Sequence, residues 1–381
     1  MIERRLVRAA AIAFVVSRVL VFAVLIAGSQ IAFVAKEYSG SVWQTRIHLR
    51  GERVLPELER VAMVGDSWWY RSIATRGYDR PPVGEQDVNW AFFPLYPMVV
   101  RALSVSDSFA VNGMLVSNLA FACSLLLLGA LARRYGLSVE DAERAIFYLA
   151  FFPTSYFLSL PMTESLFLML SLGCVLAGHH GRWLVAGLLG ALAAATRSPG
   201  VLLVIPLAIL FLIERRERPV WRALPIALVP AGTGAFMWYL HRLTNDPFAF
   251  AHVQEKWGRT AGGFWVPLFD YLGDPRAIGE QWNLVALNFL MALLLLGAAA
   301  VLLVRRQWSP GAYTLASILL PLSTSSLQSV ARYALVIFPL FFVLAMAGRR
   351  PMVDRAIFGT GVFLLGWLVA LVTLGVDFAL T

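Results

Sequence analysis

Residues 6–35 read LVRAAAIAFVVSRVLVFAVLIAGSQIAFVA, an apolar run that contains two arginines, Arg8 and Arg18. A membrane-spanning helix needs about 20 apolar residues, whereas the hydrophobic part of a cleaved signal peptide has only about 7–15. The run is therefore too long for a signal peptide. We expect an uncleaved first transmembrane helix over residues 9–34.

The whole chain shares this apolar bias. Of its 381 residues, 59% are hydrophobic and 14% are charged, and its mean hydropathy is +0.70. A soluble domain is about 45–50% apolar and about 25% charged. The composition excludes an ordinary soluble protein, a disordered chain and a nucleic-acid-binding module. The 12 tryptophans fit a membrane protein with interfacial anchors.

Further apolar runs of spanning or near-spanning length follow the first one. We expect an all-α polytopic membrane protein, a single domain over 1–381, with about eleven transmembrane helices at 9–34, 109–131, 145–161, 162–178, 183–197, 199–213, 221–241, 282–304, 310–326, 333–347 and 353–376. Several of these segments are short for a span. We expect such segments to be broken or buried within the bundle, where irregular backbone is tolerated.

Arginines in the short loops predict the orientation. Lys and Arg accumulate in cytoplasmic loops. If the N-terminus is cytoplasmic, alternating loops bring to that side Arg4, Arg5, Arg8, Arg133, Arg134, Arg182, Arg215, Arg216, Arg218, Arg305, Arg306, Arg349 and Arg350. The net charge of +9 is then a topology signal, and no excess remains to indicate nucleic acid. We expect a multi-pass protein of the cell membrane with a cytoplasmic N-terminus.

Two outer segments, 36–105 and 243–281, are too long to be simple connectors, because loops longer than about 12–15 residues are usually functional. Ionisable residues map to the same boundary, namely Asp66, Arg101, Glu164, Arg197, Arg259 and Arg332. Charged groups at membrane depth are costly and mark functional sites. We therefore expect the active site on the outer face, with 36–105 as its main loop.

Asp66 opens the segment DSWWYRSIA, residues 66–74. Aspartate is a preferred N-cap residue, so the local sequence favours a cap on a helix in which Trp69 and Ile73 share one face. The alternative is a general base that aromatic anchors hold just above the bilayer.

The segment NWAFFPLYP, residues 89–97, lies at the same boundary. Its prolines, Pro94 and Pro97, predict that no regular helix forms there. Such an aromatic run is either a membrane-interface belt or a wall for a lipid tail or a sugar ring.

Three further charged residues each have two interpretations. Glu164 follows Pro161 and starts an apolar run, so it is either a first-turn acid favoured by the helix dipole or a catalytic group. Arg197 and Arg332 either extend to the interface or bind phosphate, whose oxygens match the guanidinium fork. Two arginines at one boundary favour an anion site.

No metal site is predicted. The five histidines, at 48, 179, 180, 241 and 252, show no ligand spacing, and Cys123 and Cys174 lie in apolar runs. We expect no cofactor; a divalent metal is possible but not indicated by the sequence.

Together these segments resemble the PIG-V family, which adds the second mannose of the GPI anchor, and its bacterial relatives, within the GT-C class of integral-membrane glycosyltransferases. The matching stretches, in order, are Asp66–Tyr70 with Ile73, Ala74, Gly77 and Tyr78; Ala91–Pro97; Phe151–Ser155; Thr163–Leu166; Thr196–Ser198 with Gly200; Asp246–Phe250 with Gln254; Trp257–Arg259; and Arg332, Tyr333, Phe338 and Pro339. They extend over about 60–340. The chain departs from the family pattern at Gly65 and Met162, where Trp and Tyr are usual.

The resemblance implies a GT-C bundle that transfers a sugar, typically mannose, from a polyprenyl phosphate with inversion. The partners would be the polyprenyl-phosphate-linked sugar, a lipid or glycan acceptor, and membrane lipids. Asp66 would be the general base. We assign the donor phosphate to Arg332, Arg197 and Arg259, and the positioning of substrates to Glu164, Tyr70, Trp69, Asp246 and Tyr96. For Glu164 and Asp246 the alternative role is to orient the arginines.

Two other functions fit the same features. One is a polyprenyl-lipid or sugar transporter without transferase activity, which the lack of an internal repeat disfavours. The other is a related enzyme, such as a protein O-mannosyltransferase or a lipid-A-type glycosyltransferase. The sequence leaves open the acceptor, the sugar and the oligomeric state.

Overall fold

The computed structural model describes residues 3–37, 54–81, 87–214, 219–273 and 285–373. Every regular element among these residues is a helix, and no strand occurs in them. The prediction of an all-α protein is therefore confirmed over the described chain.

Four described helices are long and apolar enough to cross a membrane, α1 (Arg4–Glu37), α5 (Phe109–Arg134), α14 (Val285–Val304) and α18 (Pro351–Thr373). Two bent pairs raise this number to six if each pair is one span. They are η6 (Val220–Leu228) with α10 (Ala231–Thr244), bent by 41°, and α16 (Val330–Val336) with α17 (Pro339–Ala347), bent by 87°. These helices support a multi-pass membrane protein.

The remaining predicted segments coincide with shorter helices. They are α6 (Val139–Ala150), α7 (Glu164–His179), α8 (Trp183–Thr196), η4 (Ser198–Leu203) with α9 (Val204–Glu214), and α15 (Trp308–Leu322). Each of the eleven predicted segments thus overlaps a helix. That all eleven cross the membrane stays a prediction, because helix length and composition identify only four to six spans.

The predicted segment 145–161 is not one continuous helix. Helix α6 ends at Ala150, and the chain reaches α7 only at Glu164, through the short η3 (Ser155–Leu158). Pro153 and Pro161, which lack the N–H that a helix interior needs, lie within this break.

Arg18 of α1 stabilises the break. Its guanidinium donates to the main-chain oxygens of Ala150 (3.2 Å) and Ser155 (3.0 Å) and to the hydroxyls of Ser155 (3.1 Å) and Ser159 (2.9 Å). Carbonyl groups at a helix end have no partner inside the helix and must find one elsewhere, above all inside a membrane. The buried arginine supplies that partner, and the turn it holds leads to Glu164.

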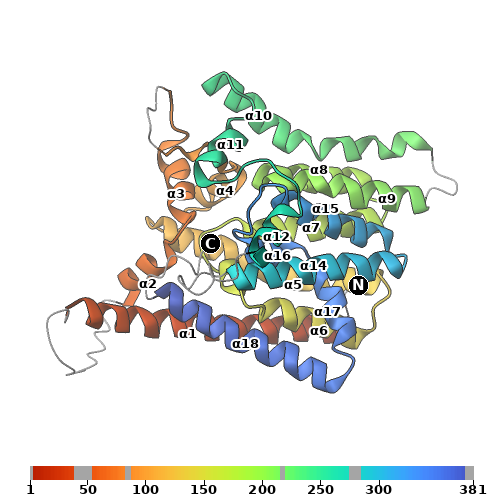
Figure 1. Ribbon diagram of the computed structural model, residues 1–381, viewed down its shortest axis with the longest axis horizontal. Coiled ribbons are helices and arrows are strands. Elements are labelled where there is room, and N and C mark those ends of the chain that lie inside the picture. The colour runs from red at the N-terminus through yellow and green to blue at the C-terminus, as the bar shows by residue number, and fades with distance from the viewer. Residues whose placement is uncertain (1–2, 38–53, 82–86, 215–218, 274–284, 374–381) are drawn as a thin grey trace.

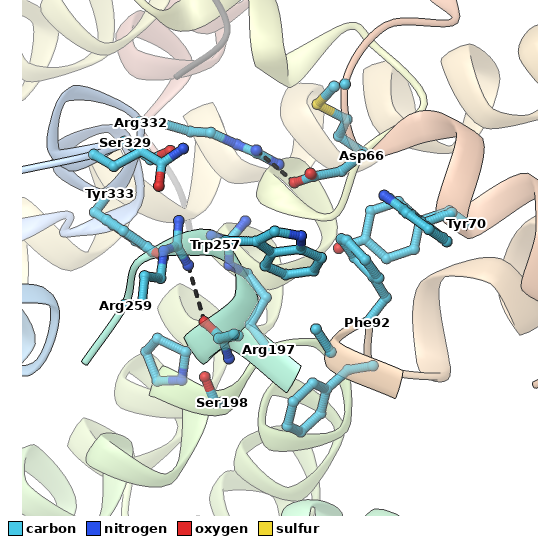
Figure 2. Close-up of a pocket in the computed structure, with 18 of the residues that line it drawn as sticks. Asp66, Tyr70, Phe92, Arg197, Ser198, Trp257, Arg259, Ser329, Arg332 and Tyr333 are labelled. Carbon is cyan, nitrogen blue, oxygen red and sulfur yellow. Dashed lines mark hydrogen bonds and ion pairs between the residues drawn. The ribbon is translucent and has the colours of Figure 1, made fainter. Parts of the chain in front are cut away.

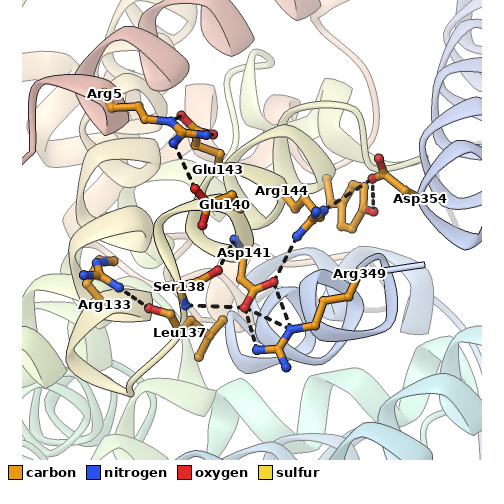
Figure 3. A network of polar contacts seen from close by, with 11 residues as sticks. Arg5, Arg133, Leu137, Ser138, Glu140, Asp141, Glu143, Arg144, Arg349 and Asp354 are labelled. Carbon is orange, nitrogen blue, oxygen red and sulfur yellow. Dashed lines mark hydrogen bonds and ion pairs between the residues drawn. The ribbon is translucent and has the colours of Figure 1, made fainter. Parts of the chain in front are cut away.

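A network of ion pairs covers one end of the bundle (Figure 3). It joins the start of α1, the α5–α6 turn and the α17–α18 turn through the pairs Arg5–Glu143 (2.7 Å), Arg133–Glu3 (3.0 Å) and Arg349–Asp141 (2.7 Å). The three arginines belong to the set predicted to share the cytoplasmic side. The predicted cytoplasmic arginines 215, 216 and 218 lie outside the described residues.

The two long predicted outer segments meet at the other end. They contain α2 (Val54–Ala62), α3 (Ser67–Arg76), η2 (Asn89–Ala91), α4 (Leu95–Ala102), α11 (Ala249–His252), η7 (Val253–Trp257) and α12 (Val266–Gly273). Figure 1 shows α2, α3 and α4 at the left and the turn from α17 into α18 at the lower right. Parts of both segments, 38–53, 82–86 and 274–281, lie outside the described residues.

The length of helix α5 gives the distance between the loop-covered end of the bundle and the end with the ion-pair network. Gly113, near its start, accepts a hydrogen bond from Tyr96 of α4, and Arg134 at its last turn contacts His180. At roughly 1.5 Å per residue the two positions are about 30 Å apart, which is the thickness of a bilayer hydrocarbon core, about 30 Å. The ion-pair network and the loop-covered end therefore lie a membrane thickness apart.

The expectation that residues 89–97 contain no regular helix is wrong for their second half. Helix α4 begins at Leu95, with Pro97 in its first turn. The first turn of a helix tolerates proline, because its N–H groups have no partner within the helix in any case.

Candidate active site

A cavity of about 300 Å³ opens at the loop-covered end. Its lining comes from the start of α3, the η2 region, the α8–η4 corner, η7 and α16, so distant parts of the chain contribute to it. The charged side chains of the lining are Asp66, Arg197, Arg259 and Arg332. Figure 2 shows Tyr70 and Phe92 on one side, and Arg259, Arg332 and Tyr333 on the other. The convergence expected of these four charged residues is thus observed.

Asp66 does not cap α3 with its side chain. It occupies the N-cap position, but its carboxylate makes no capping hydrogen bond. Instead Oδ2 accepts a hydrogen bond from Nη1 of Arg332 at 2.5 Å, and the side chain stays 33% exposed. The capping interpretation favoured by the local sequence is therefore wrong, and the carboxylate faces the cavity.

Gly65, directly before Asp66, has a left-handed backbone conformation. Its φ of +50° lies in the left-handed region, where an L-residue is strained and glycine is not. The residue before Asp66, at which the chain departs from the PIG-V pattern, therefore has a backbone reason to be glycine.

Glu164 is the first residue of α7 and is fully buried, 0% exposed, behind the cavity wall. Its Oε1 accepts hydrogen bonds from Nε of Arg332, at 2.5 Å, and from Nη1 of Arg197. Its other oxygen, Oε2, has no hydrogen-bond partner. One carboxylate thus orients both arginines, while it also occupies the helix start favoured for an acid.

Arg197 and Arg332 do not extend toward solvent. Arg197 directly follows α8, at its C-cap position, and also donates to Oγ1 of Thr163 at 3.0 Å. The side chain of Arg332 is 9% exposed, and its guanidinium carbon lies 4.9 Å from the centre of the Phe157 ring. The Nη2 atom of Arg332 is buried and has no hydrogen-bond partner among the described residues. Both arginines therefore present charge at the cavity instead of following the interface.

Arg259 approaches the cavity from η7. Its Nη1 donates to Oε1 of Gln254 at 3.0 Å, and both side chains line the cavity together with Trp257. Three guanidiniums and the carboxylates of Asp66 and Glu164 give the site a net charge of one positive unit.

Aromatic rings form the opposite wall. Trp69 stacks on Phe92, with ring centres 5.5 Å apart and an angle of 15° between planes, and Tyr70 meets Phe92 edge-on. Phe92 and Phe93 are buried within the protein, which favours the wall over a lipid-facing belt. Burial, and then the charge of Asp66, raises the pKa of Tyr70 far above its ordinary value, so its phenol stays protonated.

Two residues assigned to substrate positioning lie away from this cavity. Tyr96 is buried behind Tyr70 and hydrogen-bonds the main-chain oxygen of Gly113 and the hydroxyl of Ser117. Asp246 instead accepts from the backbone N–H of Phe248 and from Nδ1 of His252. Neither belongs to the cavity lining, whereas Trp69 and Tyr70 do.

Some cavity residues were not among the predicted site residues. The most informative are Gln328 and Ser329, which precede Arg332. Thr163, which accepts a hydrogen bond from Arg197, lies outside the lining and was not predicted either. A polar stretch, Ser323–Ser329 (STSSLQS), follows the apolar run 310–322, and this local change in polarity is the signal that could have identified the first two.

Among the described residues, no group of three or more His, Cys, Asp and Glu side chains could hold a metal ion. The charged cluster at the cavity instead pairs carboxylates with guanidiniums.

Comparison with known proteins gives little. No family model and no curated protein sequence matches the chain. Among solved structures, ArnT from Cupriavidus metallidurans, in a crystal structure bound to undecaprenyl phosphate, is similar with a TM-score of 0.49 and 12% sequence identity, over 87% of this chain and 77% of that one.

Proposed function

We propose that the chain is a GT-C-type glycosyltransferase that moves a sugar, mannose by family resemblance, from a polyprenyl phosphate to a hydroxyl group of a lipid or glycan acceptor. Asp66 acts as the general base. Arg332, Arg197 and Arg259 hold the donor phosphate. The reaction takes place at the loop-covered end of the bundle, which we assign to the outer face of the membrane.

The observation that carries this proposal is the meeting of one partly exposed carboxylate with three guanidiniums in a single cavity. Guanidinium forks match phosphate oxygens in a bidentate manner. A carboxylate beside them can accept a proton from an attacking hydroxyl. An acid for the leaving group is not required, because a lipid phosphate leaves as an anion.

The charges of the site balance those of the reaction. A polyprenyl-phosphate-linked sugar is a phosphodiester with one negative charge, which neutralises the net positive unit of the site. Transfer protonates Asp66, which raises the net charge of the site to two positive units. The leaving phosphate monoester carries about two negative charges when fully ionised. The sum is zero before and after transfer, so no uncompensated charge develops.

The step is a single displacement. The acceptor oxygen bonds to the anomeric carbon while its proton passes to Asp66. The bond from the anomeric carbon to the phosphate oxygen breaks, and its electron pair stays on the phosphate. Because attack and departure occur on opposite sides of the carbon, the anomeric configuration inverts. General base catalysis contributes about 10²–10⁴-fold, and fixed charge at the leaving group is of similar weight, about 10²–10³-fold per donor.

The guanidinium wall and the aromatic wall of the cavity match the phosphate and the sugar of such a donor. The guanidinium side fits the phosphate. The wall formed by Trp69, Tyr70 and Phe92 offers ring faces on which a sugar can pack. The cavity lies at the end of a membrane-spanning bundle, where a lipid-borne headgroup would be found.

The test is transfer itself. Purified protein in proteoliposomes is incubated with radiolabelled polyprenyl-phosphate-mannose and with membranes of the native host as the acceptor source. We expect labelled product together with released polyprenyl phosphate. Movement of the donor across the bilayer without any labelled product would contradict the proposal and indicate a transporter. A parallel reaction with polyprenyl-phosphate-glucose tests the choice of sugar.

A further inference from the structure

Arg332 is shared between the proposed base and the proposed phosphate site. Its Nε binds Glu164 and its Nη1 binds Asp66, while Nη2 between them is buried without a partner. The structure thus records the site with the base paired to the arginine that the leaving group needs.

The shape of a guanidinium limits how a phosphate can bind there. Bidentate recognition uses two adjacent N–H groups, so it uses Nη2 with either Nε or Nη1. Glu164 occupies Nε, and Asp66 occupies Nη1. Nη1 carries a second hydrogen, but a phosphate and a carboxylate on the same nitrogen would repel each other. A bidentate phosphate on Arg332 therefore favours displacement of one of the two carboxylates.

Asp66 is the carboxylate that a phosphate can displace from Arg332. Glu164 is 0% exposed and holds Arg197 as well as Arg332, so its release would strand a buried charge. Asp66 is 33% exposed, makes a single ion pair and can rotate into the cavity that it already faces.

We propose that Asp66 and the donor phosphate compete for Nη1 of Arg332, so that donor binding releases the base. This inference rests on the proposed function. It adds the order of two steps, because the donor binds before the acceptor hydroxyl is activated. While the ion pair with Arg332 holds the Asp66 carboxylate, its Oδ2 is directed at the guanidinium and not at an acceptor hydroxyl. Once the phosphate takes its place, the same carboxylate is unpaired and beside the anomeric carbon.

The test compares the affinity of one probe for matched variants. A fluorescent polyprenyl phosphate, without sugar, is titrated onto full-length protein in detergent. Asp66→Asn removes the competing charge, and we expect it to bind the probe roughly tenfold tighter than the parent, as the loss of one charge-assisted hydrogen bond implies. Glu255→Gln is the control, because it removes an exposed carboxylate from η7 outside the cavity lining.

The outcomes separate the two proposals. Equal or weaker binding to Asp66→Asn, with normal binding to the parent, overturns the competition but leaves the phosphate site standing. An equal gain in Glu255→Gln also overturns it, since general electrostatics would then suffice. If the parent does not bind the probe at all, the proposed function itself fails.

A structure of the parent with the same polyprenyl phosphate gives an independent answer that does not depend on a variant. We expect the phosphate on Nη1 of Arg332, in the place of the Asp66 carboxylate, and that carboxylate turned away from it. A bound phosphate beside an intact Asp66–Arg332 pair would contradict the inference.

Discussion

Oδ2 of Asp66 lies 2.5 Å from Nη1 of Arg332, although 266 positions separate the two residues in the chain. The first residue precedes a short helix of the long outer segment, and the second belongs to one half of a bent helix pair. Glu164, at the start of α7, is the third member of this group, because its Oε1 accepts a hydrogen bond from Nε of Arg332. The proposed chemistry thus depends on three separate helix ends, of which two contribute lining side chains to the cavity and the third holds Glu164 behind its wall.

Replacement of Arg332 by alanine should weaken the binding of the donor more than the binding of the acceptor. Arg332→Ala removes the guanidinium that we propose binds the leaving phosphate, and we expect the KM for polyprenyl-phosphate sugar to rise about 10–100-fold, as the loss of a charge-assisted contact implies. The KM for the acceptor should change little. Arg101→Ala, at an exposed arginine of α4 outside the lining, is the control. Equal effects on both substrates would exclude the phosphate role.

Replacement of Glu164 by glutamine should destabilise the protein. Arg197 and Arg332 would lose the carboxylate that both contact, and breaking a buried pair typically costs about 3–5 kcal/mol. We expect a clear fall in the thermal midpoint of Glu164→Gln in detergent. Glu143→Gln, which breaks a pair with the exposed Arg5, should cost only about 0–1 kcal/mol. If both variants have the thermal midpoint of the parent, the buried ion pairs of Glu164 do not stabilise the protein.

Arg18 should be required for the helix break beside the site. Arg18→Met keeps an unbranched apolar stem but leaves the main-chain oxygen of Ser155 without its donor, at about 1–3 kcal/mol for each buried group that stays unpaired. We expect lower thermal stability and lower yield than for Arg60→Met, which removes an arginine from an exposed helical pair. Unchanged stability of Arg18→Met would show that water replaces the guanidinium.

The pair formed by Asp246 and His252 should be sensitive to pH. The hydrogen bond from His252 to Asp246 raises the pKa of the imidazole above 6.5. A folded-state pKa above the unfolded one means that the stabilisation is complete below about 6.5 and is lost as the pH rises through the raised value. Hydrogen exchange of residues 246–252, corrected for intrinsic rates, should therefore speed up at alkaline pH. Asp246→Asn should abolish that pH dependence, and an unchanged profile would contradict the pairing.

Much of this arrangement was predictable from sequence. Arginines in short turns predicted which loops share an end, and Arg5, Arg133 and Arg349 do gather there. Apolar runs predicted the helices, and ionisable residues at the opposite boundary predicted Asp66, Arg197, Arg259 and Arg332 as site residues, all of which line one cavity.

The pairing of these charges was not predictable. The local sequence around Asp66 is that of a helix cap, and only the approach of α16 supplies the stronger partner, Arg332. The helix break between Ala150 and Glu164 is favoured locally by Pro153 and Pro161, but the arginine that binds its main-chain oxygens comes from a different helix. The tertiary contact outweighs local preference at Asp66 and adds to it at the break, and both places adjoin the site.

The most direct test of the account is the transfer rate of Asp66→Asn, measured with radiolabelled polyprenyl-phosphate-mannose under saturating donor. Asparagine preserves the shape of the side chain and can still accept a hydrogen bond from Arg332, but it cannot take up the proton of the acceptor. We predict a loss of at least about 10²–10⁴-fold with normal folding, while Asp107→Asn, at an exposed aspartate before α5, keeps the parental rate. A rate for Asp66→Asn close to that of the parent would contradict the assignment of the base.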